Sequence, residues 1–133
     1  MGLLGDWGYR KLLRHQLDAA EQHFAESLEI ARDVGHTVSI CVRLADLGDV
    51  ARRRGAYDAA ERYFNEAITL GNKHTLISWL PIVHLRYARL KAAQHDHTTA
   101  ADHLTLAQQN KPLLHIEYDK EWAQLLSELT ENN

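Results

Sequence analysis

Cysteine is almost absent from this sequence of 133 residues, in which Cys41 is the single example. One thiol cannot close a disulfide within the chain, so we expect a protein of a reducing compartment, the cytoplasm. Proline occurs twice and glycine seven times. That scarcity argues against a disordered or proline-rich linker and favours a chain that folds around one core.

Long apolar runs, an excess of basic charge and catalytic motifs are also missing. No stretch of about 18 apolar residues occurs, so no membrane span is predicted. The formal net charge of −3 argues against a nucleic-acid binder, and the one basic run, at 52–54, fits the C-terminal end of a helix. Phosphate-binding glycine loops, His-Glu-x-x-His and Gly-x-Ser-x-Gly are all absent, so we expect neither an enzyme nor a cofactor.

What the sequence does contain is a repeat with a spacing of 40 residues, which is visible in the stretches 14–28, 54–68 and 94–108. Four columns hold either small residues or large apolar residues at that spacing: Gly8, Gly48 and Ala88; Ala20, Ala60 and Ala100; Phe24, Phe64 and Leu104; Ser27, Ala67 and Ala107. Two successive offsets of 40 across several columns indicate a repeat architecture.

Each repeat is interpreted as a pair of helices, because apolar residues recur at helical spacing on both sides of a central break. We expect the small residues to let the partner helix approach closely while the aromatic residues fill the space beside them. Gly35 and Gly71 are predicted to end the second helices of their pairs. Capping boxes are predicted at Asp18 with Glu21 and at Asp58 with Glu61.

The third repeat is followed by a segment that is predicted to be a closing helix. Pro81 is expected in the first turn of the third repeat's first helix, and Pro112 is expected to begin the last helix. That helix carries a single apolar stripe, formed by Leu114, Tyr118, Trp122, Leu125, Leu126 and Leu129. We therefore predict seven helices and no strand, with repeats at about 1–35, 36–74 and 75–111 and a capping helix at about 112–131.

The order of these columns resembles the tetratricopeptide repeat: a glycine, then Gly-x-Tyr at 55–57, then Ala-x-x-x-Phe-x-x-Ala, and a closing Pro112. The resemblance covers about residues 1–114. The period of 40 is similar to the longer-helix variety found in adaptors of the G-protein-signalling-modulator type, in kinesin light chains and in sensor regions of large bacterial transcription regulators. It implies an all-α, right-handed superhelical solenoid of three helical hairpins plus a C-terminal capping helix.

The same resemblance implies a scaffold that binds a protein or peptide in a concave groove. On the family pattern, the groove-facing residues are Tyr9, Asp46, Asp49, Arg53, Arg86 and Arg89. Arg86 and Arg89 are three apart and share a helix face, and arginine binds carboxylates with a planar fork, so acidic residues are expected in the partner. The alternative is that these charges pair with one another across the repeats.

Histidines gather in the third repeat, at His95, His97 and His103. Zinc uses such ligands, but no position for a fourth ligand is evident, so we expect solvated or packed side chains there. No metal site is therefore predicted.

Leu3, Leu4 and Trp7 lie on a predicted helix that no preceding repeat covers. An apolar patch at an open end usually marks an interface. Either more repeats precede this segment in a longer parent protein, or two copies associate through this face. The alternative function is accordingly an effector-sensing or oligomerisation segment of a larger signalling or transcription-regulatory protein.

Overall fold

The computed structural model describes residues 5–131, and side chains for residues 13–130. Within this part the chain forms six α-helices, two short 3-10 helices and no strand: α1 (Gly5–Val34), α2 (Thr37–Arg53), α3 (Tyr57–Lys73), α4 (Leu80–Ala93), α5 (His97–Gln109), η1 (Lys111–Leu113), η2 (Ile116–Tyr118) and α6 (Asp119–Glu131). The prediction of an all-α fold is confirmed.

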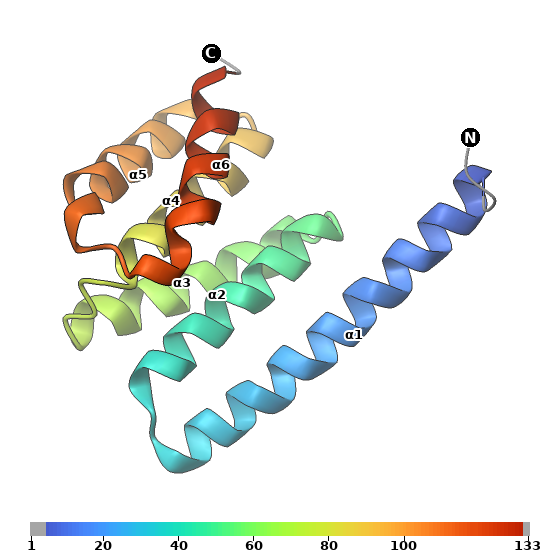
Figure 1. Cartoon of the computed structure of the whole chain (residues 1–133), viewed down its shortest axis with the longest axis horizontal. Coiled ribbons are helices and arrows are strands. Elements are labelled where there is room, and N and C mark those ends of the chain that lie inside the picture. Colours follow the sequence, from blue (N-terminus) through green and yellow to red (C-terminus); the bar gives the residue numbers. More distant parts are fainter. Residues whose placement is uncertain (1–4, 132–133) are drawn as a thin grey trace.

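The helices stack in chain order, as a solenoid of tetratricopeptide type requires (Figure 1). From α1 to α5, consecutive helices pack on one another, and α6 returns to pack on α4. A repeat array buries its apolar surface between neighbours in this way, because no single helix pair can cover its own apolar face.

The aligned columns meet at the centre of these contacts. The ring of Phe64 is fully buried, and a Cβ added to Gly48 would come within 2.8 Å of the ring. Ala60, Ala67 and Ala88 are also fully buried. Glycine and alanine therefore bring α2 and α3 close together while the aromatic ring fills the remaining space, as the sequence predicted.

The first repeat differs from the prediction, because it is one continuous helix and not a pair. The second and third repeats turn at Gly55 (φ 77°) and His95 (φ 62°), whereas His15, in the same column, lies inside α1. Gly55 adopts the left-handed conformation without steric cost. The His95 turn is followed by Asp96, whose side chain accepts a hydrogen bond from the Thr99 amide at 3.2 Å. The first repeat has neither a glycine at position 15 nor a capping aspartate at position 16, where it has Gln16, so the helix continues.

Gly71 does not end α3, contrary to the prediction, since the helix runs on to Lys73. A Cβ at Gly71 would lie 2.6 Å from Cδ2 of Leu80, the first residue of α4. The glycine therefore permits a close approach between two repeats. Gly35, in contrast, follows the end of α1 with φ 71°, as predicted.

The predicted capping boxes are also wrong, because α3 begins one residue before Asp58 and Asp18 lies in the middle of α1. Three of these four carboxylates pair with basic groups from another part of the stack instead. Asp18 and Glu21 pair with Arg54, and Glu61 pairs with Lys91 at 2.5 Å. These carboxylates thus join repeats to one another and do not cap helices.

The closing helix is present but begins later than Pro112. Pro112 lies in η1, and α6 starts at Asp119 after a second short turn. Its apolar stripe packs as predicted, with Trp122 and Leu125 buried. Pro81 lies in the first turn of α4, where its missing amide hydrogen costs no hydrogen bond.

Replacing Ala60 by leucine tests the packing of these columns. Ala60 is completely buried, so the larger side chain should overpack the α2–α3 contact and lower the free energy of unfolding by about 1–3 kcal/mol. Urea denaturation followed by circular dichroism measures the change. Ala101→Leu, at an exposed position of α5, is the matched control; equal stability of the two variants would contradict the packing described here.

Candidate functional site

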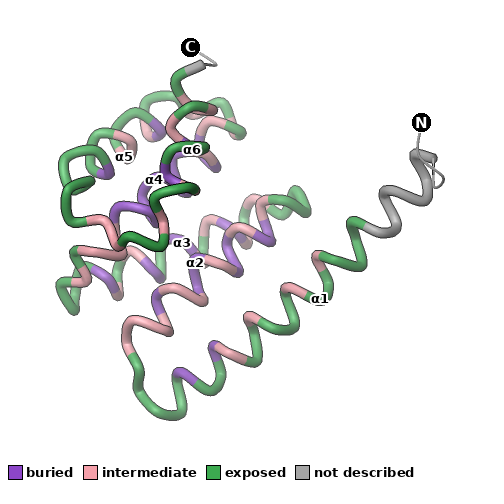
Figure 2. The backbone as a smooth tube through the Cα atoms, viewed as in Figure 1, coloured by how far each residue is buried: buried purple, intermediate pink, exposed green. Residues whose placement is uncertain are grey.

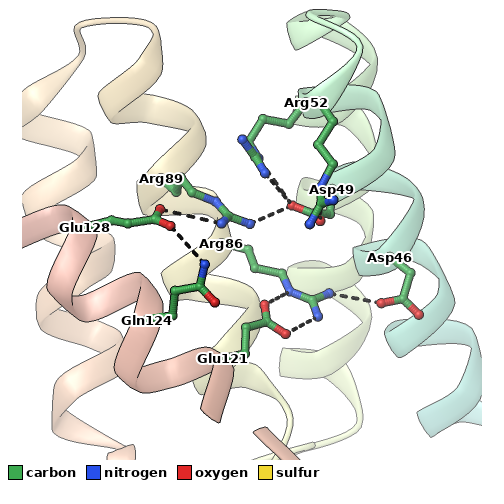
Figure 3. A network of polar contacts seen from close by, with 9 residues as sticks. Asp46, Asp49, Arg52, Arg86, Arg89, Glu121, Gln124 and Glu128 are labelled. Atoms are coloured by element: carbon green, nitrogen blue, oxygen red, sulfur yellow. Dashed lines mark hydrogen bonds and ion pairs between the residues drawn. The ribbon is translucent and has the colours of Figure 1, made fainter. Parts of the chain in front are cut away.

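The charged residues that the sequence placed in the groove form one network between α2, α4 and α6 (Figure 3). Arg86 lies at its centre and is only 7 % exposed. Its guanidinium donates to Asp46 at 3.1 Å and to both carboxylate oxygens of Glu121, at 2.6 and 2.8 Å. The planar fork of arginine suits such a two-point contact with a carboxylate.

Arg89 occupies the next turn of α4 and repeats the arrangement. Its Nη2 donates to Asp49 at 2.6 Å, and its Nη1 lies 3.7 Å from Glu128. Asp49 also accepts hydrogen bonds from Arg52 and Arg53. Figure 3 shows both arginines of α4 between a carboxylate of α2 on one side and a carboxylate of α6 on the other.

The contacts from α4 to α2 join residues that are 40 apart, which is the repeat spacing that the sequence predicts. The structure therefore favours the alternative in which the charges pair across the repeats. The contribution of α6 was not predicted, because that helix was interpreted through its apolar stripe alone. Glu121 and Glu128 are seven apart, which places both on one face after two helical turns, and that spacing was the available signal.

Burial and ion pairing shift the pKa values of this network in opposite directions. Burial works to raise the pKa of Asp49, but the guanidinium groups of Arg89 and Arg52 hold it below its ordinary value. Burial raises the pKa of Asp46 despite the attraction of Arg86. Burial works to lower the pKa of Arg86, but Glu121 and Asp46 hold it above its ordinary value. Arg86 therefore remains a guanidinium ion throughout the accessible pH range.

An open groove lies beside this network, between α1 and α2, with a volume of about 260 Å³. We call it the α1–α2 groove, and it is lined by Leu13, Gln16, Leu17, Ala20, Phe24, Asp46, Asp49, Val50 and Arg53. Its α1 side is largely apolar and its α2 side carries the charges. In Figure 2 the described part of α1 is mostly exposed or half-buried, whereas α4 is mostly buried. Sequence reasoning missed this contribution of α1, because the first repeat was expected to fold back over it.

The groove-facing residues of the prediction thus divide into two sets. Asp46, Asp49 and Arg53 line the α1–α2 groove, while Arg86 and Arg89 stand behind the two aspartates. The Tyr9 side chain lies outside the described residues, as does that of Trp7. Leu3 and Leu4 lie outside the described residues altogether.

The predicted histidine cluster separates into two pairs. His103 faces His84, with their Nδ1 atoms 2.9 Å apart, while the rings of His95 and His97 lie 6.2 Å from each other. Burial and the neighbouring His103 lower the pKa of His84 to about 4. Among the described side chains, no group of three or more histidine, cysteine or acidic residues is arranged to hold a metal ion.

Comparison with known proteins agrees with this architecture. Residues 4–73 match the sequence profile of the tetratricopeptide repeat. The chain therefore belongs to the tetratricopeptide repeat family. No solved structure gives a significant match, and no helix in residues 5–131 is long and apolar enough to cross a membrane.

Part of the chain also matches a short segment of much longer curated relatives. The chain is 35 % identical over 96 residues to the serine/threonine-protein kinase PknK of two Mycobacterium tuberculosis strains and of Mycobacterium bovis. The match covers 69 % of this chain and 9 % of each kinase. The chain thus spans about a tenth of the length of these relatives.

Arg86→Ala should be strongly destabilising, because it removes the buried partner that Asp46 and Glu121 share and leaves Asp46 with Arg43 alone. Breaking a buried ion pair from one side costs about 3–5 kcal/mol. The matched control is Arg32→Ala, which removes an ion pair to Glu66 whose two side chains are about half exposed and should cost no more than about 1 kcal/mol. Urea titrations of the three proteins measure both effects, and similar losses in the two variants would contradict the central position of Arg86.

His84 makes stability depend on pH. Its folded pKa of about 4 lies below the ordinary 6.5, so the unfolded chain binds more protons between these values. The contribution of His84 is fully present above pH 6.5 and is lost as the pH falls towards 4, by up to about 3 kcal/mol.

His84→Leu should flatten that dependence, because Leu44 occupies the same column of the second repeat and is buried there. Thermal melts of both proteins between pH 4 and 7 test this expectation. The carboxylates of the arginine network remain in the variant, so the difference between the two curves reports on the contacting pair His84 and His103. Parallel curves would show that His84 does not titrate in this window.

Proposed function

We propose that the chain is a non-catalytic scaffold that binds a protein segment in the α1–α2 groove. The observation that carries the proposal is the contrast between repeats. Phe64 and Ala60 are fully buried beneath α2, whereas their counterparts Phe24 and Ala20 are only half-buried and line the groove. Membership of the tetratricopeptide repeat family supports a protein partner.

The shape and composition of the groove favour a helical partner with an apolar stripe. A helix laid in a groove buries side chains that are three and four residues apart, and the apolar side chains of α1 recur at that spacing at Leu13, Leu17, Ala20 and Phe24. Helices are also what fill the equivalent positions in the following repeats.

We propose that the charged residues at the edge of the groove orient the bound partner. Of the residues predicted to bind the ligand, we propose that Asp46, Asp49, Arg53 and Tyr9 contact it, and that Arg86 and Arg89 act by positioning the two aspartates. Arg53 is exposed, so an acidic residue of the partner would pair with it. Such a contact weakens with salt, because exposed charges are screened.

A second candidate function is that of an effector-sensing or oligomerisation segment within a larger signalling or transcription-regulatory protein. The observation that favours it is the match to a small part of a protein kinase. In this interpretation the repeats at about 1–35, 36–74 and 75–111 with the cap at 112–131 form one domain beside others. Self-association through Leu3, Leu4 and Trp7 belongs to the same proposal. We also propose a cytoplasmic location, which fits the single thiol of Cys41 in the core.

A selection with displayed helical peptides tests the proposed function. The full chain should enrich helices with an apolar stripe, and their affinity, measured by fluorescence anisotropy, should fall at least tenfold for Leu17→Asp, which places a charge in the groove. Ile30→Asp is the matched control, because Ile30 is 64 % exposed on the same helix and does not line the groove. Equal binding by both variants, or no enrichment at all, would contradict the proposal.

The same assay also tests the proposed preference of the groove for peptides with an acidic residue. Peptides that carry an acidic residue beside the stripe should bind more weakly to Arg53→Glu and in higher salt. Binding that is indifferent to both changes would remove Arg53 from the site while leaving the apolar contact in place.

A further inference from the structure

The repeats themselves indicate what fits the α1–α2 groove. In the second repeat, the equivalent space over Phe64 is occupied by α2, with Gly48 against the ring. Position 8 is the counterpart of position 48, and it also holds glycine. The part of the chain whose sequence matches the occupant of the groove is therefore the N-terminal part of α1.

This segment cannot reach the groove of its own chain while α1 is straight. Gly8 and Phe24 are sixteen residues apart on one helix, which corresponds to about 24 Å at 1.5 Å per residue. Figure 1 shows α1 running on in one direction, with its N-terminal half beyond the end of α2. The helix carries the segment away from the groove that it matches.

We propose that the N-terminal half of α1 from a second copy of this chain fills the α1–α2 groove, and that each copy serves the other in the same way. The proposal rests on the proposed function, since it names the partner of the same groove. Two straight α1 helices would lie antiparallel, with the two-fold axis near Gln16. Gly8 of each copy would then lie against Phe24 of the other, because 8 and 24 are equidistant from 16.

In this arrangement the two copies exchange the N-terminal halves of α1. The register of the exchange matches the packing of α2 on α3 in the second repeat. Gly48 and Phe64 are equidistant from Ala56, which is the counterpart of Gln16. An exchange with this symmetry is isologous and closes as a dimer.

The columns that enter the groove are apolar ones. Leu4 and Trp7 are the counterparts of Leu44 and Leu47, which are 1 % and 4 % exposed in α2. The docked segment would thus bring a leucine, a tryptophan and a glycine to positions that are buried in the second repeat. Tryptophan is among the residue types that are enriched in protein interfaces.

The sequence near His15 favours insertion of α1 from a second copy over a turn that would fold α1 back onto its own groove. A fold-back needs a left-handed residue near His15, where the first repeat has neither the glycine of the second nor the capping aspartate of the third. Exchange between two copies keeps α1 helical and needs no change in its backbone.

Cross-linking of two single-site variants tests the register directly. Full chains that carry Gly8→Cys and Phe24→Cys are mixed and treated with a short bis-maleimide. The matched control replaces Phe24→Cys by Val34→Cys, whose site is 73 % exposed but ten residues, about 15 Å, farther along α1. Cys41 is a minor competitor, because burial raises its pKa to about 11.

The expected result is a covalent heterodimer from the first pair, at least tenfold more abundant than from the control pair. The double variant Gly8→Cys/Phe24→Cys should form dimers as well, whereas an internal link within a monomer would show that α1 folds back and would overturn the proposal. Equal yields in the two mixtures would also overturn it. Circular dichroism of each variant establishes that it is folded.

Light scattering of the unmodified chain across a dilution series supplies an independent measurement. A dimer that dissociates on dilution is expected, and a monomer at every concentration would overturn the exchange. The proposed function fails separately: displayed peptides that bind the wild-type groove but not Leu17→Asp would support it even where the chain is monomeric.

Discussion

The close approach of α2 and α3 is the constraint on which the rest of the fold depends. Gly48 leaves no room for a side chain above Phe64, and Ala60 and Ala67 keep the same interface narrow. Because every helix from α2 to α4 packs on both of its neighbours, a change in one spacing is transmitted to the next contact. The small-residue columns therefore fix the geometry of the stack, and the larger apolar side chains fill what that geometry leaves.

Charge adds a second connection of the same period. Asp46 and Asp49 reach the arginines that stand one repeat later, and α6 closes the network from the far side through Glu121 and Glu128. A buried guanidinium requires such compensation, since an unpaired one is costly to desolvate. The closing helix is thus held by an apolar stripe and by charge together. It contacts α4, whereas no helix within residues 5–131 covers the α1–α2 groove at the other end of the stack in this way.

Much of the fold could be predicted from the sequence, because it follows from columns that recur with a fixed period. The all-α architecture, the close contact at Gly48 and the packed stripe of the last helix are confirmed. Helix ends were less predictable. A capping box depends on where the helix begins, and Asp58 lies two residues after Ala56, which holds the N-cap position of α3. Gly71 shows the same limit, since a glycine at a close contact looks like a glycine at a helix end.

The candidate site was predictable in its members but not in their roles. The family pattern grouped Asp46, Asp49 and Arg53, which line one groove in the structure, yet whether a charge meets a ligand or another side chain depends on distances between helices. Those distances are set by residues far away in the sequence, such as Glu121. The single helix of the first repeat could have been anticipated only by weighing Gln16 against Asp96 as a helix cap.

The unequal burial of α1 and α4 has a consequence for how the molecule opens. Most residues of α4 are buried, and it contacts α3, α5, α6 and α2, whereas the contacts of α1 are mainly with α2. In an array held by nearest-neighbour contacts, the least covered end separates first. Amide hydrogens of α1 should accordingly exchange with solvent deuterium faster than those of α4. Protection of the backbone amides from exchange should thus increase from α1 towards α4.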